Sequence, residues 1–170
     1  MARGDISVIG VSGGARPYRV AASVTRGYAG EPIRFNSTLI SGVMTLNTVV
    51  AMEDAKPAIA TDIFVGIAQE DMKVTAAGVV VASDLNVVVP IGHTTRLRGK
   101  AKDTTTIDTD AELRTYLGDA VLFDLTSSVY TFDQDAASAD TNGLTIVGGI
   151  PHRGLLDVTV DSRALRADVS

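Results

Sequence analysis

Residues that could perform chemistry are few in this chain, and they do not gather into a familiar motif. Gly10, Ser12 and Gly14 match the Gly-x-Ser-x-Gly pattern in which a serine nucleophile sits on a sharp strand-to-helix turn. That pattern needs a following helix and a partner histidine, whereas Pro17 follows here and forbids a long helix. The stretch also lacks the Gly-Lys-Ser/Thr ending with which a Walker loop holds phosphate. We therefore interpret it as a flexible turn.

Metal-ligating residues are equally sparse. The chain contains no cysteine, which excludes thiolate zinc sites and iron–sulfur clusters, and its two histidines, His93 and His152, lie in separate predicted turns. Residues 133–143 resemble part of a calcium loop, but Ala137 and Ser138 stand where an EF-hand places an oxygen ligand and a glycine. We expect a solvated loop there, with a calcium site of another type left open. No cofactor or tightly bound metal is expected.

Carboxylates are dense beside one predicted helix. Asp108, Asp110 and Asp119 could serve a small trimeric β-barrel hydrolase acting on nucleotides or esters, provided that they line a pocket between subunits. This enzyme stays the alternative to a role without catalysis.

A row of cations offers a different chemistry, the binding of a charged partner. Arg96, Arg98, Lys100 and Lys102 occupy every second position. On a strand they share one face, while the residues between them face inward. Such a face is either solvated or meets the acidic side of a neighbouring protein, and phosphate is the weaker choice.

The charge of the chain is unevenly distributed. Residues 1–34 hold five arginines against two acids, whereas residues 103–140 hold nine acids against one arginine. This asymmetry predicts a basic N-terminal arm and an acidic body, or else an uneven solvated surface. The candidate residues for a capsid or subunit interface are Arg16, Arg19, Arg26, Arg34, Arg96 and Arg98.

The elements that must position these residues are mostly strands. Glycines, Pro17 and Pro32 interrupt residues 1–36, which we expect to form an extended arm lying on its own domain, a sister subunit or another protein. Removing residues 1–26 should then leave a folded body. Residues 37–165 predict a β-rich body and residues 166–170 a tail. Strands are predicted at 43–52, 60–68, 79–82, 87–89, 144–147 and 156–160.

Several of these strands carry finer expectations. Thr61, Ile63, Val65 and Ile67 should share one face, and the alternation in residues 156–161 predicts one wet face. The apolar runs 79–82 and 87–89 predict strands that are covered on both faces or that share one face between subunits, and a homotrimer is expected. Residues 121–125 and 129–132 form a predicted hairpin, and Asn142-Gly143 a turn.

One short helix is predicted. Thr109 and Glu112 have the spacing of a capping box, Leu113, Tyr116 and Leu117 form one apolar stripe, and Gly118 ends the helix. The expected fold class is mainly β: a small β-barrel or sandwich with this helix and the extended arm.

Composition narrows the function. The chain has 170 residues, 45% of them apolar, which suits one ordinary domain. A net charge of −5 disfavours nucleic acid, and no apolar run approaches the length of a membrane span. Tryptophan is absent and aromatics make up 5%, which disfavours a carbohydrate- or receptor-binding module. We expect a soluble protein that folds in the cytosol.

Segments of small residues and short apolar runs carry a family resemblance. They include Ala29-Gly30-Glu31-Pro32, Phe64-Val65-Gly66-Ile67-Ala68, residues 77–81, the Gly118-Asp119 that precedes a strand, and residues 142–149 and 154–158. Over residues 29–161 the chain resembles the small head decoration (cement) proteins of tailed bacteriophages.

The resemblance implies a β-rich, usually trimeric body without an active site, placed on the outside of the capsid. The expected partner is the major capsid protein, and the expected location is the virion exterior after assembly in the host cytoplasm. No nucleic acid or membrane partner is expected. Another phage head or tail component stays an alternative, because the first 30 residues are longer and richer in arginine than such a domain requires.

Overall fold

The fold is described by a computed structural model at residues 6–10, 12–20, 28–35, 39–40, 43–44, 49–51, 64–71, 84–88, 94–127, 129–135 and 143–161. Within these residues the chain is mainly β, with antiparallel sheets and one α-helix. The predicted fold class is confirmed in its sandwich form, and the described strands do not close into a barrel.

The first sheet, here sheet A, has the strand order β1-β9-β13-β12. Its strands are β1 (Ser7–Gly10), β9 (Thr95–Lys100), β13 (Leu155–Val160) and β12 (Leu144–Ile150). A single 3₁₀ turn, Pro151–Arg153, joins β12 to β13. The inner face of the sheet is aliphatic, which is why it needs a second layer over it.

That layer is a hairpin, β10 (Leu122–Thr126) and β11 (Val129–Asp133), which confirms the predicted hairpin. An isolated bridge between Ala101 and Phe132 links the residue after β9 to the hairpin, and another between Ala120 and Thr145 links the segment before β10 to β12. Phe123 and Phe132 stack at a centroid distance of 5.7 Å inside the core. The fully buried side chains around them include Leu97, Ile107, Val121, Leu144, Ile146, Leu156 and Val158.

Helix α1 (Asp110–Tyr116) forms for the reasons read from its sequence. The Thr109 side chain accepts a hydrogen bond from the Glu112 backbone N–H, and the Glu112 carboxylate accepts one from the Thr109 N–H, so the capping box is confirmed. Leu113 is buried, and Gly118 turns the chain away with a φ of 94°. Leu117 departs from the predicted apolar stripe: it ends the helix in an extended conformation and is 46% exposed.

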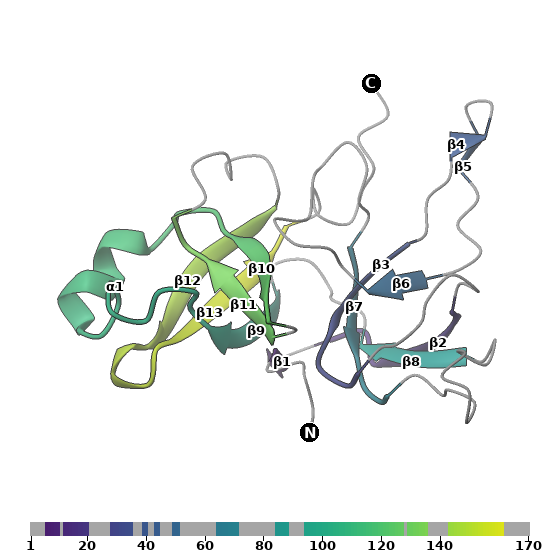
Figure 1. Cartoon of the computed structure of the whole chain (residues 1–170), viewed down its shortest axis with the longest axis horizontal. Helices are drawn as coiled ribbons and strands as arrows, with labels where there is room; N and C mark the ends of the chain where they lie inside the picture. The colour runs from purple at the N-terminus through teal and green to yellow at the C-terminus, as the bar shows by residue number, and fades with distance from the viewer. Residues whose placement is uncertain are drawn as a thin grey trace.

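The second sheet, here sheet B, has the order β2-β8-β7-β3-β6. These strands are β2 (Ala15–Arg19), β8 (Asp84–Val88), β7 (Phe64–Ala68), β3 (Pro32–Phe35) and β6 (Val49–Ala51). Sheet B and α1 lie at opposite ends of the long axis (Figure 1). One face of sheet B carries a second, smaller core, made of Val20, Ile33, Val65, Ala68, Leu85 and Val87.

Strand β7 contributes side chains to both cores, and a bulge decides which of them face each core. Ile67 pairs with Pro32 and Phe64 with Arg34, so one extra residue of β7 lies opposite β3. Phe64 and Ile67 therefore face the larger core, whereas Val65 faces the smaller one. The prediction that Val65 and Ile67 share a face is wrong, because the bulge interrupts the two-residue alternation.

One further strand prediction differs from the structure. The segment 43–52 contains two strands, β5 (Val43–Met44), which pairs with β4 (Leu39–Ile40), and β6, which joins sheet B. Val87 is buried as predicted. Residues 79–82, Thr61, Ile63 and the tail at 166–170 lie outside the described residues.

The predicted arm lies on the body of its own chain. β1 pairs with β9 in sheet A, β2 with β8 and β3 with β7 in sheet B. Ile6 and Val20 are each only 2% exposed. The segment is extended, as predicted, but strands on both sides of the expected boundary at residue 36 share the same two sheets.

Candidate binding surfaces

The outer face of sheet A carries the predicted row of cations. Along β9, Leu97 and Gly99 are buried, Arg96 and Lys100 are exposed, and Arg98 is half-buried, which confirms the alternation. The register places Ile9 of β1 beside Arg96 and Leu155 of β13 beside Lys100. Both aliphatic side chains are half-buried. The face therefore combines exposed cations with half-buried aliphatic surface.

Arg98 is held within the chain by an acid. Its Nε and Nη2 donate to the two carboxylate oxygens of Asp157 at 2.6 and 2.7 Å, a bidentate pair. The hydrogen bond to Asp157 raises the pKa of Arg98 further above its ordinary value. Asp157 and Thr159 are less than 10% exposed, so the predicted wet face of β13 is wrong. Leu156, Val158 and Val160 do face the core as expected.

Lys102 is held in the same way by the hairpin. Its Nζ lies 2.7 Å from Asp133 Oδ2 and 2.9 Å from Asp124 Oδ1. Hydrogen bonds with Asp133 and then Asp124 raise the pKa of Lys102 well above its usual range. Burial raises the pKa of Asp124, but hydrogen bonds from Lys102 and two threonine hydroxyls outweigh it and the net shift is downward. Of the four cations in the row, Arg96 and Lys100 are thus the two that the described acids do not engage.

The arginines of the arm do not gather into one patch. Arg16 and Arg19 are exposed on β2, an edge strand, and their spacing of three places them on opposite faces. Arg34 is half-buried on β3, and its Nη1 donates to the Phe35 carbonyl at 3.4 Å. Arg26 lies outside the described residues. The exposed charge of the described arm is therefore concentrated on β2.

The predicted carboxylates belong to the end of the molecule that carries α1. Asp108, Asp110 and Asp119 are all exposed. The hydrogen bond with Glu112 raises the pKa of Asp108, while hydrogen bonds from the Thr109 hydroxyl and then Asp108 lower that of Glu112. This arrangement caps a helix: the Thr109 hydroxyl donates to the Glu112 carboxylate at 2.8 Å.

Metal-ligating side chains do not cluster in the described part of the chain: no group of three or more acids and histidines there could hold an ion. His152 is exposed in the 3₁₀ turn. His93 and the centre of the predicted calcium loop, residues 136–142, lie outside the described residues.

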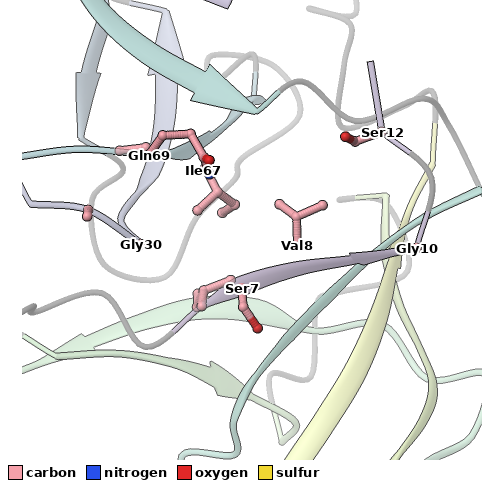
Figure 2. Close-up of a pocket in the computed structure, with 10 residues that line it drawn as sticks. Ser7, Val8, Gly10, Ser12, Gly30, Ile67 and Gln69 are labelled. Atoms are coloured by element: carbon pink, nitrogen blue, oxygen red, sulfur yellow. The ribbon is translucent and has the colours of Figure 1, made fainter. Parts of the chain in front are cut away.

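A cavity of about 380 Å³ lies between the edge of sheet A and sheet B. Figure 2 shows Val8 of β1 and Ile67 of β7 pointing into the space between the two strands. Ser12, the serine of the Gly-x-Ser-x-Gly pattern, is part of the lining, and its hydroxyl accepts a hydrogen bond from the Gly14 N–H. Sequence reasoning missed this cavity because its walls come from β1, β7 and the turn before β3. The lining residues are neutral, and they bring no acid or histidine to the serine.

Two exposed aliphatic residues were also missed. Leu117 is exposed because the helix ends there, and Val147 is 39% exposed because it is the extra residue of a bulge in β12. The Gly118 N–H donates to the Ile146 carbonyl at 2.9 Å. Leu117 precedes Gly118 and Val147 follows Ile146, so this hydrogen bond brings the two exposed residues near each other. They form a small apolar patch beside the acidic end of the molecule.

Charged sheet faces and this apolar patch are thus what the geometry offers for binding. The helix in the described part of the chain is far too short to cross a bilayer. Comparison of the chain with protein-family models, with curated proteins and with solved structures finds no match.

Proposed function

We propose that this chain is a structural virion protein that binds the outer surface of a bacteriophage capsid and stabilises the shell. The observation that carries the proposal is strand β2, where Arg16 and Arg19 are exposed from a backbone that is held in register by β8. Charges on an ordered strand suit an ordered protein surface, because little backbone order is lost on binding.

The physical logic of such a protein is additive. A capsid presents many equivalent sites, and the major capsid protein is the proposed partner. A homotrimer that engages several sites at once converts weak contacts into strong attachment, because each later contact is made at high effective concentration. The work is done on the virion exterior by contacts alone, with no cofactor.

Strand β2 is the proposed contact with the capsid. It lies at the edge of sheet B, at the end of the molecule remote from α1, and four of its five residues are exposed (Figure 1). Arg16 and Arg19 project from its two faces. Pro17 has no N–H to offer a further strand, so we expect side-chain contacts rather than extension of the sheet.

Co-sedimentation with capsids tests the proposal. The full chain is mixed with capsids of the phage that encodes it, assembled without this protein. We expect it to sediment with them, and the double variant Arg16→Ala, Arg19→Ala to bind about fivefold more weakly per subunit, since exposed ion pairs contribute roughly 0.5 kcal/mol each. The loss should shrink as salt is raised.

The matched control is Arg114→Ala, which removes an exposed arginine from α1 and should leave binding unchanged. A wild-type chain that stays in the supernatant at every salt concentration contradicts the proposed function. Equal losses in the control and in the double variant contradict the assignment of β2.

A further inference from the structure

Two surfaces of this chain carry opposite charge and lie on different elements. The acidic one, here the helix end, consists of α1 and its flanks, where residues 108–119 hold four acids against Arg114. The basic one, here the β9 face, presents Arg96 and Lys100 from sheet A. Both combine charge with aliphatic surface that water still reaches.

The helix end presents its apolar patch together with acids. Asp110 begins α1 and Leu117 follows its last residue, so an exposed carboxylate and an exposed aliphatic side chain lie about 10 Å apart along the axis. Asp119 follows two residues later, and its carbonyl accepts a hydrogen bond from the Ile146 N–H, which fixes it beside Val147. The exposed Leu117 and Val147 therefore share this end of the molecule with two exposed carboxylates.

The β9 face has the reverse composition on a comparable length. Arg96 and Lys100 are four residues apart on one strand, which places them about 13 Å from each other. Ile9 and Leu155 lie beside them, and the Arg98–Asp157 pair between them is internally neutral. A partner that brings two carboxylates beside an aliphatic patch fits this face in charge.

We infer that the helix end of one copy of this chain docks on the β9 face of a second copy. Leu117 and Val147 then pack against Ile9 and Leu155, while Asp110 and Asp119 meet Arg96 and Lys100. The contact joins two different surfaces. A copy at either end of an open chain of copies therefore keeps one surface unoccupied, and closure into a ring occupies both. The inference rests on the proposed function in one respect: it takes the homotrimer from there and assigns the surfaces through which its copies make contact.

Charge reversal tests the contact with the full-length chain. The oligomeric state is measured by light scattering and sedimentation velocity at micromolar concentration. The wild type should self-associate, and Arg96→Glu with Lys100→Glu should weaken association by about tenfold or more, because like charges then face each other. Asp110→Lys with Asp119→Lys should do the same. Combining all four changes should restore association, since the charges are again complementary.

The matched control is Arg16→Glu with Arg19→Glu, which changes the net charge by the same amount on β2 and should leave association unchanged. Thermal melting identifies any variant that fails to fold. If the fourfold variant is one of these, Arg96→Glu and Asp119→Lys, made singly and together, give the same comparison. A monomeric wild type overturns the inference, and so does association that neither reversal weakens or that the combined reversal does not restore.

The two proposals fail separately. Capsid binding by a chain whose association ignores these reversals overturns the inference and leaves the proposed function in place. If self-association responds to the charge reversals as expected but the chain does not bind capsids, the proposed function is overturned and the inference about the contact between copies stands.

Discussion

Lys102 belongs to the row of cations that begins at Arg96, but its charge is used within the chain to hold the hairpin. Its ammonium group bridges two acids of the hairpin, and the Asp124 side chain that it meets is only 6% exposed. The Thr126 and Thr131 hydroxyls donate to the other oxygen of that carboxylate. Most hydrogen-bonding positions of Asp124 are therefore filled, and Lys102 supplies the single positive charge among its partners in this network.

Replacing Lys102 by methionine should lower the free energy of unfolding by about 1–2 kcal/mol, because a largely buried carboxylate loses a charged donor. The estimate is kept small because the lysine side chain is 47% exposed. Chemical denaturation at pH 7 measures the loss. Lys100→Met, two residues away and exposed, is the matched control and should stay within about 0.5 kcal/mol of the wild type.

The same pair predicts a pH dependence. Folding lowers the pKa of Asp124, so its contribution to stability is present above the pKa of the unfolded carboxyl, about 4. It is lost as the pH falls through the lower pKa of the folded state. The wild type should therefore lose stability below about pH 4, and Lys102→Met should lose less over that range. Denaturation curves at pH 2.5, 4 and 7 measure the difference, and identical acid slopes contradict this account.

The sequence predicted which side chains of β9 face outward but not which of them have partners. Alternation is a local property of a strand, and it placed Arg96, Arg98 and Lys100 correctly. The acids that bind Arg98 and Lys102 come from β13 and the hairpin, and Asp157 is 59 residues from Arg98. Strand pairing decides such contacts, and composition does not encode it.

Among the elements, β12 and β13 depend on two adjacent glycines in different ways. A Cβ at Gly149 would collide with the Leu155 carbonyl oxygen of the partner strand, whereas at Gly148 the nearest atoms are those of Asp157 at 4.0 Å. Gly149 permits a close approach of two backbones at the start of the turn. Gly148 lies on the outer face, beside the Arg98–Asp157 pair.

Gly149→Ala should therefore destabilise the chain by about 1–3 kcal/mol, since the strands must separate to admit the methyl group. Gly148→Ala should change stability by less than about 0.5 kcal/mol. Thermal melting of the two variants side by side makes the comparison. Equal melting temperatures would mean that the turn adapts without cost.

Local signals and long-range pairing explain which elements could be predicted. The capping box and the hairpin are encoded within a dozen residues, and both were predicted. The bulges in β7 and β12 arise only when a strand meets its partner, so Val65, Ile67 and Val147 were misplaced or missed. The cavity and the apolar patch were missed for the same reason.

The N-terminal arm is built into both sheets, and this changes what its removal should do. Sequence reasoning expected a folded body without residues 1–26. In the structure these residues supply β1, β2 and two side chains buried to 2% exposure, Ile6 and Val20. Burying an aliphatic side chain contributes about 1.5–3 kcal/mol, so the loss approaches the total stability of a typical domain.

Deleting residues 1–26 should lower the melting temperature by about 10 °C or more, or prevent folding, as measured by circular dichroism. Ile6→Ala is the milder companion, and it should cost about 2–4 kcal/mol while keeping the whole arm. A truncated chain that melts with the wild type would show that the arm is a separable clasp.

The bulge in β7 restricts which changes of length this chain can accept. If Gly66 were deleted, Phe64 and Ile67 would lie two residues apart, and regular alternation would keep both on the face of the larger core, with Val65 and Ala68 on the other face. The bulge would be lost while each of these side chains kept its core. If a residue were inserted between Ile67 and Ala68, the alternation would instead turn Ala68 away from the smaller core. The bulge is therefore the place at which β7 tolerates a change of length best, because it already holds one residue more than the pairing with β3 requires.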